Sequence, residues 1–323
     1  MTLGEDQVAK VTMDWIFSVA IHPSQSRALV AAGDKRGQVG LWNLDDRSSD
    51  GGVYVFEPHS HRVGCLHFSP AHAAHLLSVS NDGSLRCGDV TKAVFDEVYR
   101  DESASFSSFD FLSNDCSTLI VGHWDAHIAV VDRRTPGTSH ELLGQVNSKT
   151  VRTVHMHPVD RNYFLTAGAR DVSIYDLRCL KPSGMHPVAS LSGNTKSVGS
   201  AYFSPVTGNR VVTICADNYI RVYDTSSLHA ESPTILLSLK HNNTTSWLTR
   251  FRPVWDPRQE DCFVVGSMER PRQIDIFHES GELVHAFTNE DCLGSVCSIN
   301  VLHPTRNLLV GGNASGRLHV FMD

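Results

Sequence analysis

The chain has 323 residues, of which 41% are hydrophobic and 20% are charged, an ordinary composition for a soluble globular protein. Its net charge of −7 argues against a protein that nucleic acid wraps on all sides, although one face can differ in sign from the whole. No apolar run approaches the roughly 20 residues of a membrane helix, and residues 1–11 lack the apolar core of a signal peptide. Eight cysteines without a Cys-x-x-Cys pair indicate free thiols in the cytosol or nucleus, and we expect no membrane association.

The predicted elements are almost all short strands, beginning with one at residues 8–12. A pattern then recurs seven times, in which a strand that commonly ends in His-Pro or Ser-Pro is followed by a second apolar strand, a polar turn and a third strand. The third strands are predicted at residues 39–44, 85–90, 128–133, 172–177, 220–225, 274–279 and 318–323. Equivalent positions in them recur at intervals of 43–54 residues, close to the WD-repeat period of roughly 40–45.

The number of repeats predicts the architecture. The last repeat stops at its third strand, at Asp323, and the strand at residues 8–12 can supply the missing fourth. Closing the ring in this way leaves no unpaired strand edge. We therefore expect an all-β, seven-bladed WD-repeat β-propeller that occupies residues 1–323 as a single domain, is closed by its N-terminal strand and is monomeric.

Two literal Trp-Asp dipeptides fall outside the ends of the third strands. Trp124 is predicted in the turn between the second and third strands of its repeat, and Trp255 is predicted to follow a first strand. The third strands end instead in Trp, Tyr, Phe or Val before the Asp or its substitute. Neither dipeptide is therefore expected to mark a repeat end.

Motifs for catalysis are missing from the sequence. It contains no glycine-rich phosphate loop and no Gly-x-Ser-x-Gly elbow. His155 and His157 would share one side of a strand, as a metal pair could, but His157 also belongs to a His-Pro strand end. The aspartates that recur after the second strands are typical turn formers, namely Asp34, Asp82, Asp125, Asp171 and Asp217. We expect no enzyme, no cofactor and no metal.

Cations recur in the loops that share one face of a WD propeller, those before the first strands and those after the second strands. These candidates for contacts with DNA phosphates are Lys35, Arg36, Arg62, Lys149, Arg170, Lys196, Arg270 and Arg272. Asn243, with Trp15, His61 and Trp124, could approach bases. Acidic residues on the same face, including Asp101 and Glu290, weaken the positive field, so the alternative of ordinary solvated loop tips stays open.

The opposite face holds the ends of the third strands. Two consecutive repeats end in Asp-x-Arg, with Asp132 and Arg134 in one and Asp176 and Arg178 in the next. Such an arginine can either pair with its own aspartate within the blade or present its guanidinium fork to a partner protein. The spacing leaves both readings open.

The segments at residues 32–44 (AGDKRGQVGLWNL) and 252–258 (RPVWDPR), together with the Val-Asp-Arg-Arg and Tyr-Asp-Leu-Arg strand ends, resemble the family of damage-specific DNA-binding protein 2. The resemblance covers essentially the whole chain, through the order and spacing of modest motifs. It implies binding of damaged or chemically modified DNA, including modified cytosine, in nuclear chromatin. It also implies docking to damage-specific DNA-binding protein 1, the adaptor of cullin-4 ubiquitin ligases, for which this chain would be a substrate receptor.

Some positions match the pattern of this family, and others depart from it. Lys35 matches the basic turn of the first repeat, Lys149 matches the basic residue before the fourth, and Arg178 matches the adaptor-docking arginine, with Arg134 as a second candidate. The lesion-sensing relative wedges apolar side chains into DNA before its sixth repeat, but residues 241–245 (HNNTT) offer no such wedge. The relative's helical adaptor-binding segment is also absent from this sequence, which predicts weaker docking.

Two functions therefore compete at this point. One is a non-enzymatic DNA-binding propeller that recruits a ubiquitin ligase, which the basic loops and the Asp-x-Arg ends favour. The other is a protein-interaction scaffold that binds peptides such as histone tails without touching DNA, which the acidic residues and the negative net charge favour.

Overall fold

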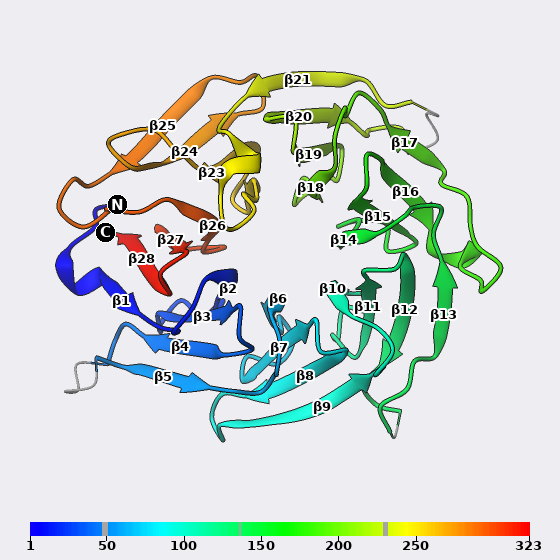
Figure 1. Cartoon of the computed structure of the whole chain (residues 1–323), viewed down its shortest axis with the longest axis horizontal. Helices are drawn as coiled ribbons and strands as arrows, with labels where there is room; N and C mark the ends of the chain where they lie inside the picture. The colour runs from blue at the N-terminus through cyan, green and yellow to red at the C-terminus, as the bar shows by residue number, and fades with distance from the viewer. Residues whose placement is uncertain (47–50, 136, 229–231) are drawn as a thin grey trace.

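The computed structural model describes residues 1–46, 51–135, 137–228 and 232–323. Seven four-stranded antiparallel sheets are arranged as blades around a common axis, as Figure 1 shows. Each blade is a short meander whose first strand lies innermost and whose fourth strand forms the outer wall of the ring. The predicted all-β, seven-bladed WD-repeat propeller is confirmed.

The first four blades follow one another in chain order. Their strands are β2 (Ile16–Ile21), β3 (Leu29–Asp34), β4 (Val39–Asn43) and β5 (Val53–Phe56); β6 (Val63–Phe68), β7 (His75–Ser80), β8 (Ser84–Asp89) and β9 (Val94–Arg100); β10 (Phe106–Phe111), β11 (Thr118–His123), β12 (His127–Asp132) and β13 (Leu142–Gln145); and β14 (Val151–Met156), β15 (Tyr163–Gly168), β16 (Val172–Asp176) and β17 (Ala189–Leu191).

The remaining three blades complete the ring. Their strands are β18 (Val198–Phe203), β19 (Arg210–Cys215), β20 (Tyr219–Asp224) and β21 (Ile235–Lys240); β22 (Val254–Asp256), β23 (Gln259–Gly266), β24 (Gln273–His278) and β25 (Leu283–Thr288); and β26 (Cys297–Leu302), β27 (Leu308–Asn313), β28 (Arg317–Met322) and β1 (Val8–Lys10). Three short 3-10 helices are η1 (Glu5–Gln7), η2 (Leu177–Cys179) and η3 (Thr244–Ser246).

The N-terminal strand closes the last blade, as the sequence predicts. β1 pairs antiparallel with β28, so that Val8 lies opposite His319 and Lys10 opposite Arg317. The two termini consequently lie side by side, and the amino group of Met1 is 3.0 Å from a carboxylate oxygen of Asp323. This pairing covers the outer edge of β28, so the seventh blade has four strands like the others.

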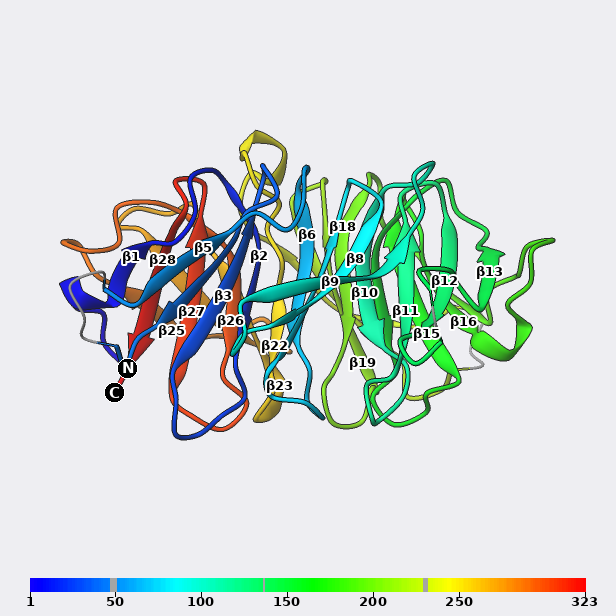
Figure 2. The same ribbon diagram turned by 90° about the horizontal axis from the view of Figure 1, so that it is seen from below.

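The two faces of the ring are built from different connections. The loops that precede the inner strands and the turns between second and third strands form what we call the top face; the remaining connections form the bottom face. Figure 2 shows the segment before β22, in yellow, rising above the top face, while both termini lie toward the bottom. Side chains between neighbouring blades form the core, exemplified by Tyr99 stacked on Phe106 at 4.9 Å.

A shared irregularity shapes the inner strands. In six of the seven, the register shifts after the first residue, as between Val151 and Thr153 of β14. Such a bulge changes the direction in which the side chain of the extra residue points. The two Trp-Asp dipeptides lie elsewhere: Trp124 follows β11, as predicted, whereas the prediction for Trp255 is wrong, because it lies inside β22, where its buried ring packs on Phe263.

Candidate nucleic-acid interface

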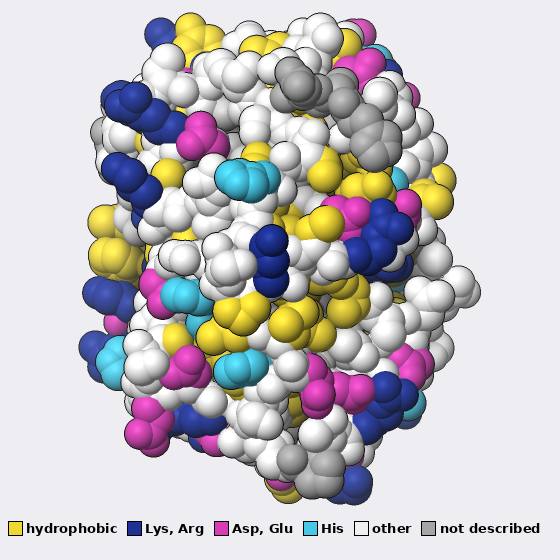
Figure 3. Space-filling model, turned by 90° about the vertical axis from the view of Figure 1, so that its right-hand side faces the viewer, with side chains coloured by type: hydrophobic (Ala, Val, Ile, Leu, Met, Phe, Trp, Pro, Cys, Tyr) yellow, Lys and Arg dark blue, Asp and Glu magenta, His cyan; other side chains and the backbone are white. Residues whose placement is uncertain are grey.

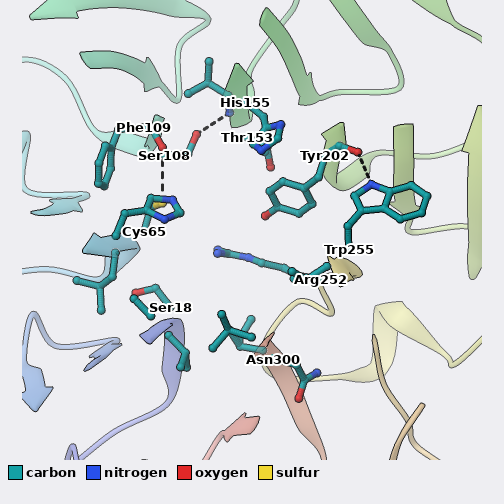
Figure 4. Close-up of a pocket in the computed structure, with 18 of the residues that line it drawn as sticks. Ser18, Cys65, Ser108, Phe109, Thr153, His155, Tyr202, Arg252, Trp255 and Asn300 are labelled. Carbon is teal, nitrogen blue, oxygen red and sulfur yellow. Dashed lines mark hydrogen bonds between the residues drawn. The ribbon is translucent and has the colours of Figure 1, made fainter. Parts of the chain in front are cut away.

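A channel runs along the axis of the ring. Its main cavity, of about 320 Å³, is lined by residues from the inner strands of all seven blades. Figure 4 shows the Arg252 side chain extending from the sixth blade into the middle of this channel. Its Nη2 donates a hydrogen bond of 3.0 Å to the carbonyl oxygen of Gly64 in the second blade. The side chain therefore spans the channel and separates the main cavity from the mouth at the top face.

Four arginines converge at the top mouth of the channel. They are Arg62, Arg152, Arg250 and Arg252, which we call the arginine collar. Arg62 immediately precedes β6, Arg152 is the bulge residue of β14, and the other two lie in the segment before β22. They line a narrow cavity of about 30 Å³ together with the rings of Phe17 and Trp124.

The collar has no counter-charge of its own. None of the ion pairs that the described residues form within 4.0 Å involves any of its four guanidinium groups. The Nε atoms of Arg62 and Arg152 are buried without a hydrogen-bond acceptor in the same part of the chain. Burial and the charges of its neighbours lower the pKa of Arg62 to about 10, and the same causes lower the pKa of Arg250 to about 10. Both groups stay protonated at neutral pH, so the collar presents concentrated positive charge.

Aromatic rings hold the collar in place. The guanidinium carbon of Arg62 lies 4.9 Å from the ring centre of Phe17 and 5.1 Å from that of Trp124. Arg250 approaches Trp124 at 5.8 Å, and the indole N–H of Trp124 donates to Asn81 Oδ1 at 3.1 Å. Cation–π contacts of this kind attract the cation but leave its N–H donors available to an anion.

The sequence-predicted cations surround the mouth on the top face but differ in their surroundings. Those exposed to solvent are Lys35, Arg36, Lys149, Arg170, Lys196 and Arg270, and the amide of Asn243 is also exposed. The Lys35 ammonium lies 4.3 Å from the centre of the Trp15 ring, Arg36 pairs with Asp14 at 3.0 Å, and Arg272 lies 6.0 Å from the Trp247 ring. Arg62, predicted for the same rim, lies deeper, in the collar.

Several aspartates of the top face are occupied by the fold. Asp34 is buried and accepts backbone hydrogen bonds from Arg36 and Gln38 at 2.8 and 2.9 Å. Burial opposes ionisation of Asp82, but hydrogen bonds from His59 and Ser84 hold its pKa well below its ordinary value. These residues form turns, as the sequence predicts, and their carboxylates accept hydrogen bonds from neighbouring groups of the fold.

The loop before the sixth blade carries one apolar side chain that the sequence argument overlooked. The expectation of no apolar wedge considered only residues 241–245, but the loop continues past η3, where Leu248 is 55% exposed. Trp247 beside it is partly buried against the core of the fifth and sixth blades. The top face therefore does present an apolar side chain beside the collar.

The Asp-x-Arg arginines of the bottom face are paired within their blades. Arg134 binds Asp132 through Nε at 3.0 Å and Nη2 at 2.6 Å, and Arg178 binds Asp176 in the same way at 2.9 and 2.6 Å. Both arginine side chains remain more than half exposed, at 67% and 62%. Pairing with the aspartate and exposure to solvent occur together at both arginines, so the two readings left open by the sequence are compatible.

A third Asp-x-Arg pair lies on the bottom face at the end of β22. Arg258 binds Asp256 at 3.1 and 3.0 Å and also donates to Asn307 Oδ1 at 2.8 Å in the next blade. Its side chain is only 26% exposed. This pair ties two blades together rather than facing solvent.

The histidines and acidic residues are further candidates for metal ligands. Among the described residues, no group of three or more His, Cys, Asp or Glu side chains is arranged to hold a metal ion. His155 lines the channel, whereas His157 accepts backbone hydrogen bonds from Val159 and Asp160 at a turn.

Figure 3 shows one outer side of the ring, where Lys, Arg, Asp and Glu side chains are scattered among neutral and hydrophobic ones. In the part of the chain that the structure describes, no helix has the length and apolar character needed to cross a membrane.

Comparison with known proteins finds a matching repeat model and similar chains. A WD domain, G-beta repeat model matches residues 52–89. WD repeat-containing protein 76 of Xenopus laevis is 64% identical over all of this chain and 56% of its own length, and that of Mus musculus is 58% identical over all of this chain and 51% of its own length. The chain is a WD-repeat protein and a close homologue of WD repeat-containing protein 76. It spans about half the length of these curated relatives.

More distant relatives carry a functional name. DNA damage-binding protein cmr1 of Neurospora crassa is 27% identical over 97% of this chain and 65% of its own length. The predicted resemblance to DNA damage-binding WD-repeat proteins is thus confirmed. WD-repeat propellers are typically non-catalytic scaffolds.

Sequence reasoning found the rim but missed most of the collar. Arg152 lies within the inner strand β14, and Arg250 and Arg252 lie where the sequence predicts a first strand before Trp255, so none of the three is among the predicted loop cations. A signal was present in Arg152, the one charged residue at a position that holds Phe17, Gly64, Ser107, Gly199 and Ser298 in five other repeats. A charged side chain at a position that faces the channel has few structural reasons to be there.

Proposed function

We propose that this chain is a non-enzymatic DNA-binding propeller of nuclear chromatin, which contacts damaged or modified DNA with its top face. The observation that carries the proposal is the arginine collar, four guanidinium groups at the channel mouth without a carboxylate partner among the described residues. Their repulsion is relieved by an anion from outside the chain, and DNA phosphates are the anions that a ring of surrounding lysines and arginines also attracts. Relatives named DNA damage-binding protein support the choice of DNA.

In this proposal the rim and the centre of the top face contact different parts of the DNA. Exposed rim cations such as Lys35 and Lys149 contact the phosphate backbone and position the protein without reading sequence. The collar and the exposed Leu248 lie closer to the axis, where the protein meets a distorted or opened stretch of DNA. Leu248 is suited to wedge against an unstacked base.

Titration of fluorescent duplex DNA at several salt concentrations, followed by anisotropy, tests the proposal. We expect the double variant Lys35→Glu and Lys149→Glu to bind more weakly and to flatten the plot of log K against log salt by about 0.9 per lost phosphate contact. The matched control reverses two exposed bottom-face lysines, Lys92→Glu and Lys181→Glu, and should bind like the wild type. No binding at about 50 mM salt, or an unchanged slope in the top-face variant, contradicts DNA binding.

The same experiment separates the competing scaffold function. If histone-tail peptides displace DNA and bind equally well to the variant with reversed Lys35 and Lys149, the chain is a peptide-binding scaffold instead. A peptide site that survives this reversal does not use the basic rim.

We further propose that the bottom face docks to damage-specific DNA-binding protein 1, making the chain a substrate receptor of a cullin-4 ubiquitin ligase. The clamped, exposed forks of Arg134 and Arg178 support this role. In a pull-down with the adaptor, Arg178→Ala should reduce recovery and the double variant with Arg134→Ala should reduce it further. Arg170→Ala, an exposed arginine of the top face, is the matched control. Unchanged recovery with the double variant counts against this docking mode.

A further inference from the structure

A second cavity opens beside the collar, between the fifth and sixth blades at the top face. It measures about 270 Å³, and its walls include Arg152, Ile214, Thr245, Trp247, Leu248 and Arg250. Arg152 and Arg250 belong both to this cavity and to the channel mouth. We call it the blade-5/6 pocket.

The blade-5/6 pocket is rich in donors that lack acceptors. The Nε of Arg152 and the indole N–H of Trp247 are buried with no hydrogen-bond partner within the described part of the chain. Arg250 forms no ion pair among these residues and is held by the face of Trp124 at 5.8 Å. Leaving buried donors unpaired is unfavourable, so a site with such donors is expected to meet an acceptor.

The walls of the pocket also define what kind of acceptor fits. None of the residues that line it is acidic, and Arg250 is exposed to solvent, so an incoming anion meets two guanidinium groups and no carboxylate. Ile214 and Leu248 contribute apolar surface on the same walls. The combination suits a compact anion of two charges that is attached to a less polar group.

We propose that the blade-5/6 pocket binds a phosphate monoester, supplied by the phosphorylated end of a DNA strand. A monoester carries about −1.5 to −2 charges at pH 7 and three acceptor oxygens, whereas an internal phosphodiester carries one charge. Guanidinium groups bind such oxygens in pairs of parallel hydrogen bonds. The terminal nucleoside then lies against Ile214 and Leu248. This inference rests on the proposed DNA binding of the top face and specifies which DNA it prefers: strands with phosphorylated ends.

The test compares two duplexes that differ only at the end of a short single-stranded overhang, which carries either a 5′-phosphate or a 5′-hydroxyl group. We expect the wild type to bind the phosphorylated duplex on the order of tenfold more tightly at equal salt, since charged hydrogen bonds are gained. Arg250→Gln should reduce this ratio to about one, and Arg152→Gln should act in the same direction. Thermal unfolding of each variant establishes that it is folded.

The matched control is Arg270→Gln, which removes one positive charge from the top face outside the pocket. It should weaken binding of both duplexes by the same factor and keep the wild-type ratio. Inorganic phosphate at millimolar concentration should abolish the preference of the wild type without releasing the hydroxyl duplex.

The outcomes separate the inference from the function on which it rests. If the hydroxyl duplex binds and the phosphorylated one binds no better, the pocket does not take strand ends, although DNA binding stands. If the ratio is unity but inorganic phosphate raises the unfolding temperature, and Arg250→Gln removes that shift, the pocket serves a free phosphate and the DNA-end assignment is wrong. If neither duplex binds at low salt, the proposed function itself fails.

Discussion

Two arginines at the top of the propeller, Arg221, which is buried, and Arg62, which is partly buried, differ in their counter-charge. Arg221, in β20, is 6% exposed and pairs with Asp217 at 2.8 Å, and both side chains are enclosed. Arg62, in the collar, is held between aromatic rings and has other arginines as its charged neighbours. Burial lowers the pKa of both groups, but the hydrogen bonds and charge of Asp217 raise the pKa of Arg221 overall, whereas that of Arg62 stays lowered to about 10.

The difference separates a structural arginine from one that awaits a ligand. Where the chain supplies the counter-charge, the arginine is part of the fold, and its loss leaves a carboxylate behind. Where the chain supplies no counter-charge, as around Arg62, the proposed function assigns that role to an anion from outside the chain. The following variants test this distinction.

The largest effect is expected for the paired arginine. Arg221→Met keeps the length of the side chain but leaves the carboxylate of Asp217 without its ion-pair partner. The Asp217 side chain is 8% exposed. We expect the free energy of unfolding to fall by about 3 kcal/mol, as for other broken buried pairs. Urea denaturation measures it, and a loss under about 1 kcal/mol would show that the pair is not structural.

The next effect comes from adding charge to buried groups that have no partner for it. Burial lowers the pKa of His123 and His319 to about 4, below the ordinary 6.5. The unfolded chain therefore takes up protons below pH 6.5 while the folded chain does not, so stability falls as the pH drops from about 6.5 toward 4. At pH 5 each histidine should cost about 2 kcal/mol relative to pH 7.

Thermal unfolding between pH 4 and 8 checks this dependence. His319→Gln keeps a polar side chain beside Asn313 and removes one titrating group, so its profile should be flatter than that of the wild type. A wild-type profile that is level across this range, or an unchanged slope in the variant, contradicts the assignment.

A smaller effect of opposite sign is expected in the collar. Arg62→Met retains the apolar stem between Phe17 and Trp124 but removes a repelled charge and a buried Nε without an acceptor. We expect the free energy of unfolding to stay level or rise by up to about 1 kcal/mol, while affinity for DNA falls about tenfold. Denaturation and anisotropy on the same preparation measure both. A variant that loses stability as Arg221→Met does would make the collar structural.

The sequence predicts the ring well because the ring is a local pattern repeated. Each inner strand ends in a recognisable way, and each third strand recurs at a similar interval, so even the closure by β1 follows from counting. The collar is not local. Arg252 and its acceptor Gly64 are 188 residues apart, and they meet only because the ring closes around the axis.

The Asp-x-Arg pairs of the bottom face show what a local spacing does and does not predict. Asp132 and Asp176 are predictable from the sequence because they end third strands, whose positions follow from the repeat. The pair of Asp256 and Arg258 has the same spacing but lies at the end of an inner strand, β22. The sequence predicts that Trp255 follows this strand, whereas the structure places Trp255 inside it. Spacing alone does not tell an exposed fork from an interblade tie, because the neighbouring blade decides how much of Arg258 remains exposed.

The smallest expected effect on stability concerns the exposed fork. Arg178→Ala removes a side chain that is 62% exposed, while the backbone N–H at this position still donates to Asp176 at the start of η2. Exposed ion pairs contribute little to stability, so we expect the free energy of unfolding to stay close to that of the wild type. Arg258→Ala instead leaves Asp256, which is 3% exposed, without its fork and should cost more. Equal losses in urea denaturation would show that Arg178 also supports the blade, and reduced adaptor docking by Arg178→Ala could then no longer be read as loss of a contact.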